Sequence, residues 1–218
     1  MRDEEIHQAI TILRECARQW QPGLVDDMAR VEPNPYHILI ATILSLRTKD
    51  TLTAVIAPKL FAVASTPQEM VRHAAEEIAQ IIYPVGFYNT KAQSILEVSR
   101  ILLDQYDGRV PDDLEALLQL PGVGRKTANL VITAGYNKPG ICVDTHVHRI
   151  SNRWGYVQTK TPEATEFALR VKLPPEYWIE YNGLLVSFGQ TLCHPTSPRC
   201  SVCPVYQYCD RVGVTRSR

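Results

Sequence analysis

The sequence has no excess of charge of either sign and no long apolar run. Lys and Arg together number 23, as do Asp and Glu, so the formal net charge is zero. This balance argues mildly against a nucleic-acid-binding protein, which is usually basic, although a local basic patch matters more than the sum. No apolar stretch approaches the roughly 20 residues of a membrane-spanning helix. We therefore expect no membrane contact, and the acidic, amphipathic start MRDEEIHQAITIL is not a signal peptide.

Alternating strand patterns, internal repeats and low-complexity tracts are also missing, and helical patterns take their place. Residues 36–46, YHILIATILSL, are apolar on nearly all sides and predict a central buried helix. Thr66-Pro-Gln-Glu69 has the form of a capping box, and Pro111 precedes a helix for which we expect Asp112 as the N-cap. The fold class is predicted to be all-α, with further helices at 4–20, 67–74, 75–83, 90–106, 125–134, 162–172 and 175–192.

Six cysteines point to metal binding or chemistry rather than to disulfides in a chain without a signal peptide. Cys16 and Cys142 lie in helical or apolar settings and are expected to be small buried side chains. The other four follow the order C-x6-C-x2-C-x5-C and could hold zinc or a [4Fe–4S] cluster, between which spacing alone does not choose. These candidate ligands are Cys193, Cys200, Cys203 and Cys209.

A glycine-rich turn, Leu120-Pro-Gly-Val-Gly-Arg-Lys126, joins two predicted helices. Gly122 and Gly124 would allow backbone N–H groups to converge on an anion. Arg125 and the positive end of the second helix would help to bind a phosphate there. An ordinary tight turn between helices fits the same pattern equally well.

Lys126 and Asp144 are the candidate catalytic residues. Lys126 is expected in the first turn of its helix, where the helix dipole and Arg125 disfavour the protonated amine and so favour a nucleophile. A phosphate-binding or solvated lysine is the alternative. Asp144 follows Ile-Cys-Val, so we expect a partly buried carboxylate that caps a helix, stabilises charge, or does both. His146 and His148 are two residues apart and should face different sides of a helix, so they do not predict a metal site.

Together these residues resemble the endonuclease III family of helix-hairpin-helix DNA glycosylases. LPGVGRKTAN at 120–129 is similar to the family's hairpin and catalytic lysine, and VDTHVHR at 143–149 to the segment with its catalytic aspartate. The cysteine spacing is similar to its [4Fe–4S] motif, which favours iron–sulfur over zinc. LSLRTKD at 44–50 and VGFYNTKA at 85–92 look like its two DNA-penetrating loops.

The resemblance implies two helical domains with DNA in a cleft between them: 28–138 with the hairpin, and 1–27 with 139–218, which holds the cluster. It implies a bifunctional DNA glycosylase and AP lyase that excises damaged bases, expected to be oxidised pyrimidines, and nicks abasic sites by β-elimination. Its partner would be double-stranded DNA with damaged bases or abasic sites, bound by a cytoplasmic monomer, at the nucleoid if prokaryotic. The implied DNA contacts are Arg47, Phe87, Gly122, Gly124, Arg125, His146 and Arg199.

Departures from the family pattern bear on substrate range and DNA affinity rather than on reaction type. Arg47 stands where many members have Gln, Phe87 where many have Leu, and Arg199 is the one fixed cation in the loop HPTSPR. Alternatives are a mismatch-specific thymine or uracil glycosylase and an adenine glycosylase relative, which generally lacks the lysine and carries a further C-terminal domain. A non-catalytic iron–sulfur DNA-binding module would leave Lys126 and Asp144 unexplained.

Overall fold

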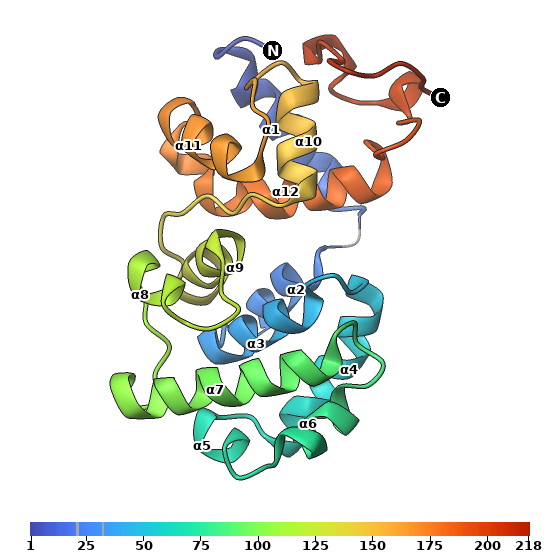
Figure 1. The fold of residues 1–218 in the computed structure, drawn as a ribbon. Coiled ribbons are helices and arrows are strands. Elements are labelled where there is room, and N and C mark those ends of the chain that lie inside the picture. The colour runs from blue at the N-terminus through green and yellow to red at the C-terminus, as the bar shows by residue number, and fades with distance from the viewer. Residues whose placement is uncertain (21, 32) are drawn as a thin grey trace. The chain divides into compact units, whose positions relative to one another are not determined.

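The computed structural model describes residues 1–20, 22–31 and 33–218, and within these ranges all regular structure is helical (Figure 1). The predicted all-α fold class is confirmed. None of the described helices is long and apolar enough to cross a membrane. The chain packs into two compact units: the hairpin unit, Leu24–Gly140, and the cysteine unit, Met1–Gly23 with Ile141–Arg218. Their equivalence to the domains expected from the resemblance stays a prediction.

The hairpin unit is built around helix α3 (Pro35–Ser45). Every side chain from Tyr36 to Leu44 except that of His37 is buried, as a sequence that is apolar on all sides requires. Asn34 caps the helix, and its side chain accepts hydrogen bonds from two backbone N–H groups. The elements that pack against α3 are α2 (Leu24–Val31), α4 (Asp50–Val63), α7 (Tyr88–Tyr106), α9 (Arg125–Leu130) and the π-helical turn η1 (Val131–Gly135).

Short helices complete the hairpin unit: α5 (Pro67–Met70) and α6 (Ala75–Ile82), which pack on α7, and α8 (Leu114–Leu118), which packs on α9. The capping box at Thr66 and Glu69 is confirmed. The expected N-cap of α8 was wrong by one residue. Asp113 is the cap and accepts from the N–H of Ala116 at 3.0 Å, whereas Asp112 pairs with Lys138. The local pattern could not reveal this difference, because Lys138 comes from a distant part of the chain.

The cysteine unit combines the N-terminal segment with residues 141–218 (Figure 1). Its core contains Trp154, Tyr181 and Phe188, each 1% exposed. After residue 191 the chain has no α-helix among its described residues. This agrees with the irregular structure that the prolines and cysteines of the last 26 residues suggested. The elements of this unit are α1 (Glu5–Ala17), α10 (Thr145–Arg153), α11 (Pro162–Lys172), the 3-10 turn η2 (Pro175–Tyr177), α12 (Trp178–Thr191), and the 3-10 turns η3 (Cys200–Val202) and η4 (Tyr206–Tyr208).

Candidate active site and cluster pocket

The glycine-rich turn connects α8 to α9, and its two glycines differ. Gly122 has a φ of 76°, in the left-handed region that favours glycine. Gly124 caps α9 with an extended backbone, φ −98° and ψ 177°. A Cβ at position 124 would meet no heavy atom within 4 Å. The shape of the turn therefore requires glycine at 122, whereas glycine at 124 leaves the N-terminus of α9 open to a ligand.

Lys126 is the second residue of α9 and is half-buried, so its predicted place in the first helical turn is confirmed. Side-chain bonds reinforce this helix. Asn129 Nδ2 donates to the carbonyl of Arg125 at 3.0 Å, and Thr133 Oγ1 donates to the carbonyl of Asn129 at 2.9 Å. The helix then continues into the π-helical turn η1, a distortion that is common near functional sites. The backbone around Lys126 is thus held from within the helix.

Asp144 is the N-cap of α10 in the cysteine unit. Its Oδ1 accepts from the backbone N–H groups of His146 at 2.8 Å and Val147 at 2.9 Å. The side chain is half-buried, as expected after an apolar tripeptide. The capping interpretation is confirmed, and it is compatible with a chemical role because the N–H donors and the dipole of α10 favour a negative charge there.

The two histidines of α10 have different partners. His146 Nδ1 lies 3.1 Å from Arg149 Nη2, which also donates to the Cys193 carbonyl at 2.9 Å. His148 Nδ1 lies 2.7 Å from Thr165 Oγ1. The helix that Asp144 caps is therefore bonded to the first cysteine of the motif through Arg149.

The four motif cysteines line one pocket, part of which is open to solvent. Thiols spread around a pocket suit a cluster of several irons, which four thiolates hold. Burial raises the pKa of Cys203 to about 12 and also raises that of Cys209, so a metal must displace these protons. The donor set and its spacing in the pocket fit an iron–sulfur cluster.

Arg153 is bonded to both ends of the cysteine motif. Its Nη1 donates to Cys193 Sγ at 3.5 Å and to the His194 carbonyl at 2.6 Å, while its own carbonyl accepts from Cys209 Sγ at 3.5 Å. The bond to Cys193 Sγ is of the kind that orients and tunes a cluster ligand, whereas Cys209 donates only as a thiol and would lose this bond as a thiolate ligand. Sequence reasoning missed Arg149 and Arg153. Their spacing of four residues, which puts both on one face of α10, is the signal that could have found them.

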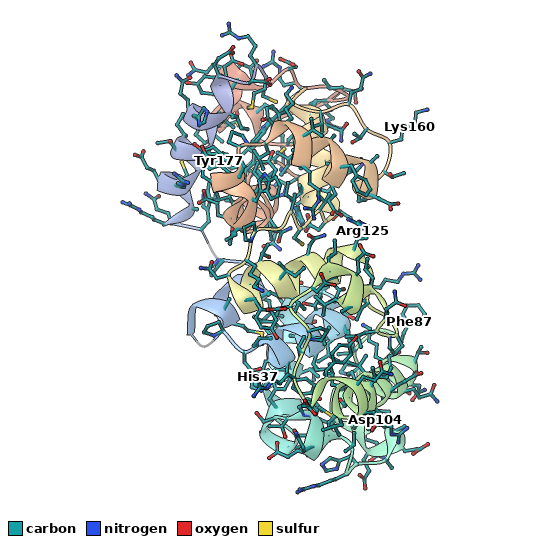
Figure 2. All side chains as sticks on the ribbon, turned by 90° about the vertical axis from the view of Figure 1, so that its left-hand side faces the viewer. His37, Phe87, Asp104, Arg125, Lys160 and Tyr177 are labelled. Atoms are coloured by element: carbon teal, nitrogen blue, oxygen red, sulfur yellow. The ribbon has the colours of Figure 1, made fainter. Side chains whose placement is uncertain are left out.

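The two loops expected to enter DNA lie together in the hairpin unit. Arg47 and Phe87 both have left-handed backbones, with φ of 53° and 59°. This conformation is uncommon for residues other than glycine and often occurs at functional sites. The guanidinium of Arg47 lies over the Phe87 ring, 5.6 Å from its centroid. Both side chains are exposed, and Phe87 lies at the edge of its unit (Figure 2).

Comparison with known families gives two matches. Residues 40–175 match the family model described as HhH-GPD superfamily base excision DNA repair protein. Residues 193–209 match the iron–sulfur binding domain of endonuclease III. The first match covers more than half of the chain and contains Lys126 and Asp144; the second contains the four motif cysteines. The chain belongs to the HhH-GPD superfamily of base excision DNA repair proteins.

Individual relatives narrow this assignment. The endonuclease III of Thermotoga maritima is 50% identical over 82% of this chain and 84% of its own length. A trapped endonuclease III–DNA covalent intermediate matches with a TM-score of 0.86 at 32% identity over 97% of both chains. A thermostable thymine-DNA glycosylase, with a TM-score of 0.74 at 24% identity over 93% of this chain and 97% of its own, shares the fold alone. The chain is thus an endonuclease III family DNA glycosylase and AP lyase with a [4Fe–4S] cluster, which confirms the predicted enzyme and cofactor over the non-enzyme and zinc alternatives.

Proposed function

We propose that this enzyme excises oxidised pyrimidines from double-stranded DNA with Lys126 as nucleophile and Asp144 as its charge-stabilising partner. The observation that carries the proposal is the position of Lys126 in the first turn of α9, directly behind the open N-terminus at Gly124. A phosphate bound by the hairpin N–H groups would bring a nucleotide within reach of this amine. The enzyme acts as a monomer in the cytoplasm, at the nucleoid if prokaryotic.

The reaction begins with a base that has been rotated out of the duplex. The amine of Lys126 attacks C1′, and the bond between C1′ and the base breaks with its electron pair leaving on the base, which takes up a proton. The carboxylate of Asp144 stabilises the positive charge that develops on the sugar or accepts a proton from Lys126. The C1′–O4′ bond then breaks with its electron pair leaving on O4′, which takes up a proton as the Lys126 nitrogen loses one, and the opened sugar is joined to Lys126 as a Schiff base. The Schiff base acidifies the proton at C2′, and its removal expels the 3′ phosphate and nicks the strand.

Arg47 and Phe87 would keep the duplex open during this reaction. Rotating a base out costs a few kcal/mol, and less for a damaged, poorly stacked base. An exposed ring beneath a guanidinium can stack on the remaining bases and fill the gap. Arg125, His146 and Arg199 are proposed as further DNA contacts. The [4Fe–4S] cluster supplies structural cross-linking through Cys193, Cys200, Cys203 and Cys209, and the chemistry above needs no redox change.

The substrate class is tested with a panel of duplexes that contain an oxidised pyrimidine, a mismatched thymine or uracil, adenine opposite an oxidised guanine, or an abasic site. We expect nicking at the oxidised pyrimidine and the abasic site, with kcat/KM at least about tenfold above the mismatches. That ratio corresponds to about 1.4 kcal/mol of discrimination. Preferential removal of mismatched thymine would replace the proposal with the mismatch-specific alternative.

Gly124→Ala tests the hairpin as a phosphate site. The stability of the protein should not change, because the backbone is extended and the added Cβ meets no heavy atom within 4 Å. Affinity for damaged and undamaged duplexes should fall alike, by roughly tenfold, because the added methyl group would hinder the close approach of a phosphate and weaken about one charge-assisted hydrogen bond. Fluorescence anisotropy at fixed salt measures the affinity, and thermal unfolding measures the stability.

Gly122→Ala is the contrasting variant. Its φ of 76° costs an alanine about 1–2 kcal/mol, so this variant should lose stability. A Gly124→Ala protein that binds DNA with unchanged affinity would show that the hairpin is an ordinary turn between helices.

A further inference from the structure

Lys91 is a buried cation that the proposed chemistry does not use. It lies in the second turn of α7 and is 6% exposed. Its Nζ donates to the carbonyls of Leu44 at 2.7 Å and Leu46 at 2.6 Å and to Thr48 Oγ1 at 3.0 Å. An ammonium has three donors, and these bonds employ all of them. Burial lowers the pKa of Lys91 to about 8, so the charge is retained there at a desolvation cost.

These acceptors belong to the end of α3 and to the turn that follows it. The last carbonyls of a helix lack partners within the helix and carry its negative dipole end, where a cation is favourable. Lys91, which belongs to α7, therefore caps the C-terminus of α3. Arg47, whose backbone is left-handed, follows Leu46 directly. The Lys91 ammonium is therefore bonded to the residue before Arg47 and to the residue after it.

The same turn is bonded to the one that carries Phe87. Thr48 Oγ1 accepts from the N–H of Gly86 at 3.2 Å as well as from Lys91. A Cβ on Gly86 would lie 2.9 Å from the carbonyl oxygen of Arg47, so the two backbones touch and only glycine fits there. We call Lys91, Thr48 and Gly86 the clasp. Arg47 lies between Leu46, whose carbonyl accepts from Lys91, and Thr48 of the clasp. Phe87 directly follows Gly86 of the clasp.

We propose that Lys91 is a positioning residue whose ammonium holds Arg47 and Phe87 as one rigid arrangement for opening a paired base. The inference rests on the proposed roles of these two side chains. Two loops from separate parts of the chain must keep a fixed spacing to enter one gap in a base stack. The clasp supplies that spacing with bonds to two backbone carbonyls and to the Thr48 hydroxyl, none of which depends on the Arg47 or Phe87 side chains. Cleavage of a ready-made abasic site, where there is no base to extrude, needs this arrangement far less.

The experiment compares Lys91→Met with wild type on two substrates. Methionine keeps most of the length and the apolar volume of the side chain and removes all three donors. We expect the rate on a paired oxidised pyrimidine to fall at least tenfold, while nicking of a ready-made abasic site stays within twofold. Phe87→Ala should give the same pattern. Lys59→Met, which changes an exposed lysine in the same unit, is the matched control and should alter neither rate.

A spectroscopic signal reads base opening without turnover. In Lys126→Gln protein, which should bind without reacting, 2-aminopurine opposite the lesion should brighten at saturating protein and brighten less once Lys91→Met is added. Thr48→Val removes the link between Lys91 and Gly86, keeps the shape of the side chain, and should lower the signal in the same direction. If Lys91→Met does not fold, Thr48→Val is the variant that tests the proposal.

Equal losses on both substrates in a variant with normal thermal unfolding would overturn the proposal, as would unchanged 2-aminopurine fluorescence. The proposed function fails differently. Wild-type protein that brightens the probe but nicks neither substrate would refute the chemistry assigned to Lys126 and leave the role of Lys91 to be judged by fluorescence. Wild-type protein that does neither would refute both.

Discussion

Lys126→Gln protein is expected to bind damaged DNA and to form no covalent complex with it in the presence of borohydride. Borohydride reduces a Schiff base to a stable amine, so wild-type protein should become joined to DNA during turnover. Glutamine keeps the polarity and much of the length of the side chain but has no nucleophilic amine. Strand nicking should therefore fall by at least about a thousandfold, as for other covalent nucleophiles, while affinity stays within a few-fold. Denaturing gels measure both products.

The structure supplies controls for this experiment. Lys138→Gln removes an exposed amine of the hairpin unit that pairs with Asp112, and this variant should still be trapped. Lys91 has all three donors bonded and is buried, so it is not placed to replace the nucleophile. If Lys126→Gln protein is trapped at the normal rate, another amine attacks C1′ and the assignment is wrong.

Asp144→Asn in the same assay separates capping from chemistry. Asparagine caps a helix about as well as aspartate, so the bonds from the N–H groups of His146 and Val147 should survive and stability should hardly change. Base release should slow, because the neutral amide stabilises positive charge poorly. Asp144→Ala should slow base release and also lose about 1 kcal/mol of stability with the cap. Equal base release by Asp144→Asn and wild type would leave Asp144 with a capping role alone.

Elements with local signals could be predicted from the sequence. The helix expected at 162–172 is α11 with the same bounds, and the Thr66–Glu69 capping box forms because both partners lie within one turn. The N-cap of α8 could not be predicted from its neighbours, because the pairing of Asp112 with Lys138 depends on tertiary contact. The short helix α2 was not expected, although its eight residues are strongly amphipathic, because so short a segment gives only two turns of the pattern.

The residues of the candidate site likewise include some that local motifs reveal and some that depend on tertiary contacts. The hairpin, the aspartate that caps α10 and the cysteines lie in contiguous motifs, which the sequence reveals directly. Lys91 has acceptors more than 40 residues earlier in the chain, and no local pattern names them. A signal was nevertheless present: Lys91 shares the stripe of Ile95, Val98 and Leu102, all buried. A lysine on a buried stripe requires acceptors, and its presence could have predicted a bonded cation.

Cys200→Ser is expected to lose the [4Fe–4S] cluster and to destabilise the end of the cysteine unit. A serine hydroxyl is a much poorer iron ligand than a thiolate. Residues 193–218 form only two 3-10 turns among their regular elements, and Pro198 and Val205 are the buried apolar residues in that segment. Since cluster binding is coupled to folding, stability should fall by more than about 4 kcal/mol. Iron and sulfide analysis, absorption at the blue end of the visible spectrum and thermal unfolding measure the loss.

Cys16→Ser is the matched control for this change. Cys16 is half-buried on α1 and does not line the pocket of the four motif cysteines, so this variant should keep its iron and its brown colour. The Cys200 variant should also lose DNA affinity regardless of the lesion, because the proposed DNA contact Arg199 directly precedes the lost ligand. Full iron occupancy and normal unfolding in Cys200→Ser protein would exclude Cys200 as a ligand. The loss of iron with stability unchanged would instead show that the contacts of Arg149 and Arg153 with residues 193–195 hold the segment without the cluster.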